Sequence, residues 1–195
     1  SPVDLAGAVM QGNAEVLAAI VCMNLLAPGH PVLYGNGPFV SDLRTGAFAG
    51  GGGEMALLTA ASAQMANFYD LPSGIGAGMT SSKQPDAQAG WEKGYLAAIA
   101  GLAGVNMIYQ SAGILADVMA ISPEMMVIDA EMTAGALRAV RGIEVTDEAL
   151  SVDTIAEVVA GPGHFLGHPR TLDLMETEYV YPDLACRRSI RDWED

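Results

Sequence analysis

The chain has 195 residues, 51% of them hydrophobic and 16% charged, which suits one domain with a substantial core. Its 23 acidic and 9 basic residues give a formal net charge of −14, which repels polyphosphate and so excludes nucleic acid and anionic membrane as expected partners. Cys22 and Cys186 stand far apart without metal-ligand spacing, so no disulfide or zinc site is expected and a reducing, cytoplasmic location is the default.

The first elements are an abrupt start and an apolar helix. Residues 2–6 resemble the end of a strand, which indicates a piece of a longer protein. Asn13 is a plausible N-cap for a helix over residues 14–27, which is apolar on all sides and is therefore expected to be buried on most of them. The most apolar part of that helix, residues 16–26, is too short to span a bilayer, so no membrane partner is expected.

Short apolar runs that end in polar or glycine-rich loops then alternate with stretches of helical length. The runs predict strands over residues 32–34, 73–77 and 106–109, and the stretches predict helices over residues 54–69, 87–103 and 123–140. Strands that alternate with helices imply parallel βαβ units, whose right-handed crossovers place the loops after the strands on one rim. Functional groups are therefore expected on that rim.

The last part of the chain predicts a helix from Thr146 to near Gly161, then a short helix from Thr171 and an extended acidic tail. Four strands and four or five helices in strict alternation favour an α/β fold, about four units of a (β/α)8 TIM barrel, with a small open parallel sheet as the alternative. The expected organisation is a partial barrel domain over residues 1–163. Residues 164–195 are expected to pack on the barrel or on a partner.

The candidate functional groups on the rim each have a structural alternative. Asp42 and Arg44, two residues apart in a long loop, are catalytic groups or an internal tie of that loop. Tyr34 and Tyr109 end strands, and their rings attract a quaternary ammonium or fill the core. The glycine run 50–53 lacks the spacing of a phosphate-binding motif, so a flexible lid or hinge is favoured there.

His164 and His168 are four residues apart, a spacing that metal ligands use on a helix. Gly163, Gly167 and Pro169 break helical geometry around them, so a structural turn is favoured and no metal is expected.

Several long motifs also occur together along the whole chain: Pro31–Gly35, Asp42–Gly46, Glu54–Leu57, Pro85–Lys93 and Gly163–Pro169. In their order and spacing they resemble the trimethylamine methyltransferase family. The resemblance implies a longer (β/α)8 barrel, of which this chain is the C-terminal half or somewhat less. It also implies transfer of a methyl group from a methylated amine to the Co(I) of a separate corrinoid protein, so the corrinoid is carried by that partner and no cofactor is bound tightly by this chain.

The family also implies the substrate class. Archaeal members carry pyrrolysine in a loop that resembles Gly113–Met119, and here Asp117 or its neighbour occupies the equivalent position. Without pyrrolysine we expect a quaternary amine such as glycine betaine, because it leaves as a neutral amine, whereas a neutral tertiary amine needs activation.

Rim placement and this chemistry assign provisional roles. We expect Tyr34, Tyr109 and Gln110 to contact the substrate, Asp117 or Asp42 to complement the cation as the catalytic carboxylate, and Arg44 or Lys83 to bind a substrate carboxylate. His164 and His168 belong to a family motif of undefined role, and Arg170 stands where a further histidine-like position is expected, which weakens a metal site.

The alternative hypothesis is a catalytically incomplete barrel fragment that acts only as a binding or oligomerisation module. Half a barrel exposes two sheet edges that need covering, so a homo-oligomer is expected under either hypothesis.

Overall fold

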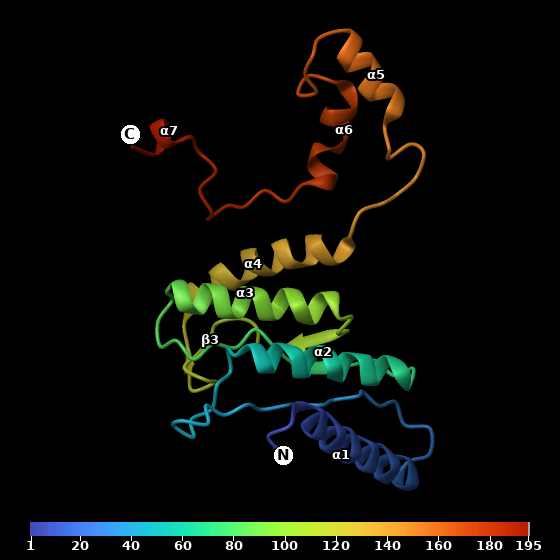
Figure 1. Cartoon of the computed structure of the whole chain (residues 1–195), viewed down its shortest axis with the longest axis vertical. Coiled ribbons are helices and arrows are strands. Elements are labelled where there is room, and N and C mark those ends of the chain that lie inside the picture. The colour runs from blue at the N-terminus through green and yellow to red at the C-terminus, as the bar shows by residue number, and fades with distance from the viewer. Residues whose placement is uncertain (195) are drawn as a thin grey trace. The chain divides into compact units, whose positions relative to one another are not determined.

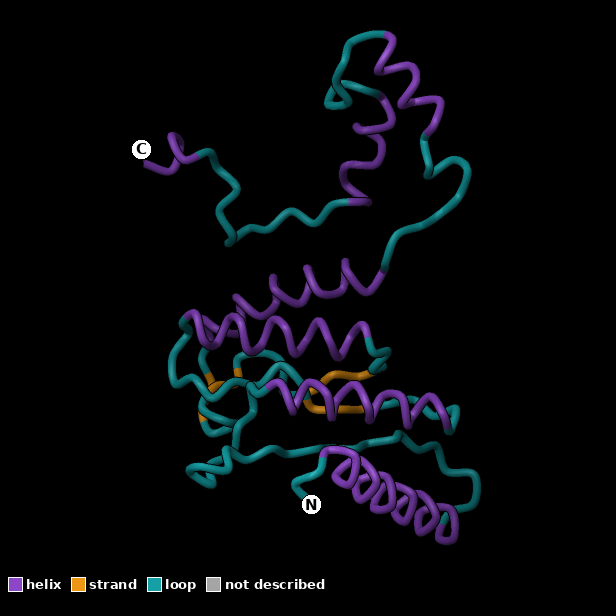
Figure 2. Tube along the Cα trace, viewed as in Figure 1, coloured by secondary structure: helices purple, strands orange, loops and turns teal. Residues whose placement is uncertain are grey.

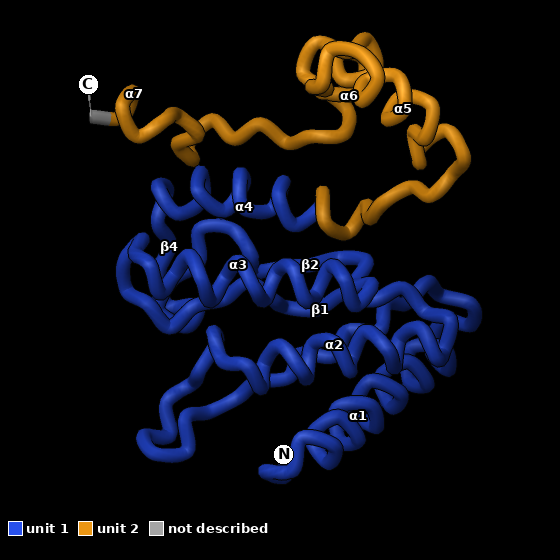
Figure 3. The backbone as a smooth tube through the Cα atoms, turned by 45° about the horizontal axis from the view of Figure 1, so that its top comes forward, with its two compact units in different colours: residues 1–137 blue, residues 138–195 orange. Residues whose placement is uncertain are grey.

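The computed structural model describes residues 1–194 and divides into two compact units, one from residue 1 to residue 137 and one from residue 138 onward (Figure 3). The first unit holds, in chain order along Figure 1, α1 (Leu5–Leu26), α2 (Gly53–Phe68), β1 (Gly74–Gly76), α3 (Ala87–Leu102), β2 (Met107–Tyr109), β3 (Ile114–Leu115), β4 (Ala120–Ile121) and most of α4 (Pro123–Arg141). The predicted division at residue 163 stays a prediction.

The strands of the first unit are short, with long loops around them (Figure 2), and they form one parallel pair, β1 with β2, and one antiparallel pair, β3 with β4. β1 pairs in parallel with β2, with Ile75 opposite Ile108. The strand expected at residues 32–34 shrinks to one parallel bridge between Tyr34 and Ser73, in which the Tyr34 N–H donates to the Pro72 carbonyl at 2.8 Å. Three parallel segments therefore lie side by side in chain order, which confirms the α/β class.

The helices α2 and α3 cover one face of these strands. α2 contacts β1, α3 contacts β2, and the two helices contact each other. Helices on opposite faces of a sheet could not touch, because each helix layer stands about 10 Å from the sheet. Met55, Leu96 and Ile75 are buried on this side. On the other face the half-exposed side chains of Leu33 and Met107 approach Gly74, and we call this the uncovered face because α2 and α3 lie on the opposite one.

Local signals explain why α3 and α4 begin where the sequence predicts. The Asp86 carboxylate accepts the N–H of Ala89 at 2.9 Å, and this bond, with the Ser82 hydroxyl, lowers the pKa of Asp86. The Ser122 hydroxyl oxygen accepts the N–H of Met125 at 3.1 Å in the same way. The helices expected over residues 54–69, 87–103 and 123–140 are confirmed within a residue or two.

The first helix differs from its prediction in extent and in burial. α1 begins at Leu5 rather than after Asn13, because the Asp4 carbonyl already accepts the N–H of Ala8 at 2.9 Å, so residues 2–6 are not the end of a strand. None of its residues is buried in the described structure. Its 22 residues with a mean hydropathy of 1.5 are long and apolar enough to cross a membrane, a test that core helices and signal sequences also pass.

The second unit holds α5 (Val152–Ala160), α6 (Pro169–Glu178) and α7 (Ile190–Glu194). The helix expected from Thr146 begins six residues later, because Ser151 adopts a left-handed conformation with φ 52°. α6 begins two residues before the predicted Thr171, since His168 Nδ1 accepts the N–H of Arg170 at 3.2 Å. α7 interrupts the tail that was expected to be extended.

Candidate functional site

The loops that follow β1 and β2 meet, as the rim prediction requires. In the loop after β1, the Thr80 carbonyl accepts the N–H of Asp117 at 2.9 Å, and the Ser82 carbonyl accepts the N–H of Ala116 at 2.7 Å. The two loops, residues 77–86 and 110–122, are therefore joined by backbone hydrogen bonds, and we call them the rim loops.

Asp117 lies where three segments converge. Its Oδ1 accepts the N–H of Gly50 at 3.0 Å and the hydroxyl of Ser81 at 2.6 Å, whereas its Oδ2 has no hydrogen-bond partner among residues 1–194. Three consecutive residues, Ala116, Asp117 and Val118, have φ of 49°, 55° and 70°. Left-handed backbone costs about 1–2 kcal/mol for each L-residue, so the surrounding contacts must hold this turn in place.

The glycine run beside Asp117 is fixed rather than flexible. Gly50 and Gly51 are buried, and a Cβ on Gly51 would overlap the Glu92 carboxylate. The hydroxyl of Tyr95 donates to the Gly51 carbonyl. The expectation of a lid or hinge is therefore wrong at these two residues, because close packing against α3 is what requires glycine there.

Glu92 connects this turn to the first rim loop, and sequence reasoning missed it. Its Oε2 accepts the hydroxyl of Thr80 at 2.5 Å and the N–H of Ser81 at 3.0 Å, and its Oε1 accepts the Gln88 amide at 2.9 Å. A carboxylate in this position holds Ser81 where its hydroxyl reaches Asp117.

Tyr109 and Gln110 lie together on the uncovered face of the strands. A Cβ on Gly76 would stand 3.2 Å from the Tyr109 ring and 2.7 Å from Gln110 Oε1. Tyr109 is partly exposed, and Gln110 has a left-handed φ of 64°. The missing side chain at Gly76 is therefore what leaves room for both groups.

Tyr34 lies on the opposite, helix-covered face, so the structure does not bring it together with Tyr109. Its hydroxyl donates to Asn13 Oδ1 at 3.0 Å, and its ring stacks on Tyr69 with centroids 6.2 Å apart. Burial, and then Tyr69, raises the pKa of its hydroxyl. This placement agrees with the alternative that the Tyr34 ring fills the core. A substrate contact for Tyr34 stays a prediction, which this geometry does not favour.

Replacing Tyr34 by phenylalanine tests that placement. We expect Tyr34→Phe to lower the free energy of unfolding by about 1 kcal/mol, because a part-buried hydrogen bond to Asn13 is lost. Chemical denaturation measures this loss. A substrate-affinity change without a stability change would instead place Tyr34 in the site.

Asp42 and Arg44 form an ion pair within their own loop. Arg44 Nη2 lies 2.6 Å from Asp42 Oδ2, and the pair closes the tip of a hairpin in which Ser41 bridges Phe48. The Arg44 side-chain bond, with a backbone bond from the same residue, lowers the pKa of Asp42 to about 2. Both groups are free of contact with Asp117 in the described chain, and their catalytic role stays a prediction.

The Asp42–Arg44 ion pair predicts a small dependence of stability on pH. A carboxyl whose pKa is lowered by folding contributes stability above its unfolded pKa and loses it as the pH falls through the folded value. We therefore expect the melting temperatures of wild type and Asp42→Asn to differ at pH 6 and to converge as the pH falls from about 4 toward about 2. A gap that persists unchanged at low pH would contradict this assignment.

Lys83 stands on the first rim loop, with Nζ donating to the Ser81 carbonyl at 2.5 Å. Its ammonium group is exposed and is two residues from the hydroxyl that contacts Asp117. The structure thus brings Lys83, Ser81 and Asp117 into one neighbourhood.

His164 and His168 belong to the second unit, and His168 stands at the start of α6. His168 caps α6 through Nδ1, while its Nε2 lies 3.6 Å from Glu157 Oε2. Arg170 pairs with Glu148 at 3.1 Å. Across residues 1–194, no three His, Cys, Asp or Glu side chains gather closely enough to hold a metal ion.

A buried ion pair that sequence reasoning missed lies beneath the rim loops. Lys93 Nζ of α3 stands 3.2 Å from Asp129 Oδ2 of α4, and both side chains are fully buried. Burial lowers the pKa of Lys93, opposed by Asp129. Burial likewise raises the pKa of Asp129, opposed by the N–H of Gly113 and by Lys93.

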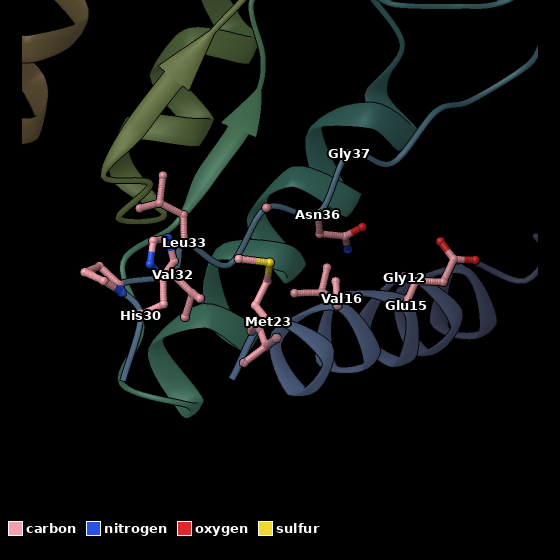
Figure 4. A pocket seen from close by; sticks show the side chains of 13 residues that line it. Gly12, Glu15, Val16, Met23, His30, Val32, Leu33, Asn36 and Gly37 are labelled. Atoms are coloured by element: carbon pink, nitrogen blue, oxygen red, sulfur yellow. The ribbon is translucent and has the colours of Figure 1, made fainter. Parts of the chain in front are cut away.

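A separate groove of about 440 Å³ runs between α1 and the segment 30–37 (Figure 4). It is lined mainly by apolar groups, including Val16, Met23 and Leu33. Asn36 packs so closely on Gly12 that a Cβ there would stand 2.5 Å from Asn36 Oδ1. In the described chain the backbone groups of Leu33 and Gly35 have no strand partner on this side, so the groove follows an open sheet edge.

Comparisons with known proteins converge on one family. The model of the trimethylamine methyltransferase (MTTB) family matches residues 1–195. A glycine betaine methyltransferase of Desulfitobacterium hafniense (strain Y51) is 39% identical over 192 residues, which are 98% of this chain and 40% of that protein. A trimethylamine methyltransferase MttB of Methanosarcina thermophila is 41% identical over 193 residues, 99% of this chain and 39% of that protein. The chain thus spans about two fifths of the length of these relatives.

Proposed function

Because the chain belongs to the trimethylamine methyltransferase family, we propose that it is part of an enzyme that transfers a methyl group from a methylated amine to a corrinoid protein. The names of its relatives support a methylated amine as donor. The corrinoid belongs to the partner protein and is the methyl acceptor, so the proposed enzyme binds no tight cofactor of its own.

The observation that carries the proposal is the half-satisfied carboxylate of Asp117. Its Oδ1 is fixed by Gly50 and Ser81, which orients the group, and its Oδ2 is left free to face a cation. Tyr109 ends β2 and Gln110 follows it, and both lie on the uncovered face of the strands. An anion and an aromatic ring are the groups that attract a quaternary ammonium, and the proposal takes one from each of the two segments.

We propose a quaternary amine as the donor. The Co(I) of the partner's corrinoid supplies the electron pair that forms the bond to the methyl carbon. The C–N bond breaks with its electrons on nitrogen, which leaves as a neutral tertiary amine without proton transfer. The residues of this chain therefore need only hold the cation and orient one methyl group, which is catalysis by positioning.

A betaine would add a carboxylate to be bound. Lys83 is the better candidate for it, because its ammonium lies beside Ser81 on the rim loop whereas Arg44 is already paired with Asp42. This assignment favours glycine betaine or a related betaine over simple methylamines.

The fold supports the partial barrel. In a (β/α)8 barrel all helices lie outside the strands, and here α2 and α3 share one face while Gly74 and Gly76 lie under side chains on the other. The open edge at Leu33 and Gly35 would then be covered by another strand or another copy, which favours a homo-oligomer or a longer parent. We place the enzyme in the cytoplasm, where its reduced corrinoid partner would be maintained.

The decisive experiment supplies the full-length enzyme with reduced corrinoid protein and a panel of quaternary, tertiary and secondary methylated amines. Methylation of the corrinoid is followed by its absorbance spectrum. We expect transfer from a quaternary amine. The proposal fails if no amine methylates the corrinoid, and the substrate class fails if only tertiary amines do.

Replacing Asp117 separates the two carboxylates proposed for the site. We expect Asp117→Asn to lower kcat/KM for a quaternary amine about tenfold, equivalent to about 1.4 kcal/mol, because the amide keeps the two hydrogen bonds but removes the charge. Asp42→Asn is the matched control and should leave kcat/KM unchanged. A larger loss in Asp42→Asn would move the catalytic carboxylate to the hairpin.

The second candidate is a binding or oligomerisation module, favoured by the exposed apolar surface of α1 and by the open edge beside its groove. Sedimentation at several protein concentrations distinguishes the two. Self-association without methyl transfer supports the module, whereas methyl transfer supports the enzyme in any oligomeric state.

A further inference from the structure

The buried pair Lys93–Asp129 joins both rim loops to the helices beneath them. Lys93 Nζ donates to the Gly78 carbonyl at 2.8 Å and to the Ile114 carbonyl at 3.1 Å. Asp129 Oδ2 accepts the N–H of Gly113 at 2.7 Å. Gly78 is the second residue of the first rim loop, and Gly113 and Ile114 lie three to four residues before Asp117 in the second.

The backbone at Gly78 and Gly113, where the ion pair meets the rim loops, has little conformational freedom. Gly78 and Gly113 have φ of 75° and 71°, which side chains rarely adopt. A Cβ on Gly78 would stand 3.1 Å from Ser111, and one on Gly113 would stand 3.1 Å from Met126. The pair therefore holds backbone that is already bent and tightly packed.

Stability alone does not account for two charges in this position. Burying an ion pair removes both ions from water, and well-packed apolar residues of similar volume are often as stable or more so. The pair is also incompletely satisfied, since Asp129 Oδ1 is buried without a hydrogen-bond partner in the part of the chain that the structure describes. What the charges provide is directed hydrogen bonds to three backbone groups of the rim loops.

We propose that Lys93 and Asp129 are positioning residues that set the two rim loops relative to each other, and thereby aim Asp117 and Ser81 at the substrate. The inference rests on the function proposed above. It assigns no contact with substrate to either residue.

The test compares the full-length enzyme with Lys93→Met/Asp129→Leu, in which both charges are removed together. We expect this variant to stay folded, with kcat for methyl transfer at least tenfold lower and KM for the amine changed less than threefold. Amide hydrogen exchange should quicken at least tenfold in residues 77–86 and 110–118 and stay unchanged in α2. Thr59→Val is the matched control, because it also replaces a buried, unpartnered polar group, at a position in α2 away from this junction.

A smaller change covers the case in which the double variant does not fold. In Lys93→Met/Asp129→Asn the amide still accepts from Gly113, whereas no group holds the Gly78 and Ile114 carbonyls. Faster exchange should then appear in residues 77–86 while Gly113 stays protected.

The outcomes separate the two proposals. Wild-type kcat and wild-type exchange in the charge-free variant overturn the positioning role, as does exchange that rises uniformly through the unit. If the wild-type enzyme methylates no corrinoid, the proposed function fails, and the exchange pattern still decides whether the pair sets the loops.

Discussion

Replacement of Lys93 alone by methionine is expected to lower the free energy of unfolding by about 3–5 kcal/mol, because Asp129 would remain as a buried charge without its partner. Urea denaturation followed by circular dichroism measures the loss. The charge-free double variant should lose less than Lys93→Met does, since it leaves no unpaired buried charge and gives up only the hydrogen bonds to the rim loops.

The pH dependence of Lys93→Met has a definite sign. Burial raises the pKa of Asp129 in the folded state, and Lys93 opposes that rise, so the pKa climbs further when Lys93 is lost. A carboxyl whose folded pKa is raised favours folding when protonated, and the penalty therefore shrinks as the pH falls toward that raised pKa. A penalty that grows on acidification would contradict the assignment of the buried charge to Asp129.

Replacement of Gly51 by alanine is expected to cost about 3 kcal/mol of unfolding free energy, because the added methyl group overlaps the Glu92 carboxylate. Glu92 cannot move aside cheaply. Its carboxylate accepts bonds from Thr80, Ser81 and Gln88, and hydrogen bonds to charged groups are worth about 1.5–3 kcal/mol each.

Gly53→Ala is the control for this prediction. Gly53 begins α2, and a Cβ there would meet nothing within 4 Å. It should be neutral or stabilise by about 0.5 kcal/mol, since alanine restricts the unfolded chain. Equal effects of the two substitutions, measured by thermal unfolding, would show that the glycine run is loosely packed after all.

Much of the fold follows from local signals in the sequence. Asp86 and Ser122 cap α3 and α4 at the expected residues, and α2 lies within a residue of its expected bounds. The predicted starts of α1 and α5 are wrong, because the local sequence there gives no signal or a misleading one. Asn13 lies inside α1, where its side chain bonds Tyr34 and Tyr69 rather than capping a helix, and a left-handed Ser151 delays α5.

The candidate site was only partly predictable for a related reason. Lys and Asp side chains are usually solvated, so the sequence alone gives no reason to expect Lys93 and Asp129 to be a buried ion pair. Their spacing held a signal, because Lys93 stands four residues from both Ala89 and Ala97 on the buried face of α3. Asp129 likewise stands four residues after the buried Met125 of α4. Only the tertiary structure shows that these two faces meet.

Tyr34 shows the limit of reading a side chain's direction from its place along a strand. Its place at the end of a strand suggested the rim, but side chains alternate between the faces of a strand, and position along the strand does not specify the face. The bridge to Ser73 turns Tyr34 toward α1 and Tyr69, and leaves Leu33 on the uncovered side.

The left-handed turn at residues 116–118 is held in place by main-chain hydrogen bonds. Its backbone is held by the carbonyls of Thr80 and Ser82, bonds that use no atom of the residue 117 side chain. These bonds by themselves fix the direction of the Cα–Cβ bond at residue 117, and the contacts of the Asp117 carboxylate with Gly50 and Ser81 add to them. Exchange of the side chain at residue 117 could then alter the chemistry of the rim while its architecture is conserved, which makes this turn the natural place to redesign substrate choice.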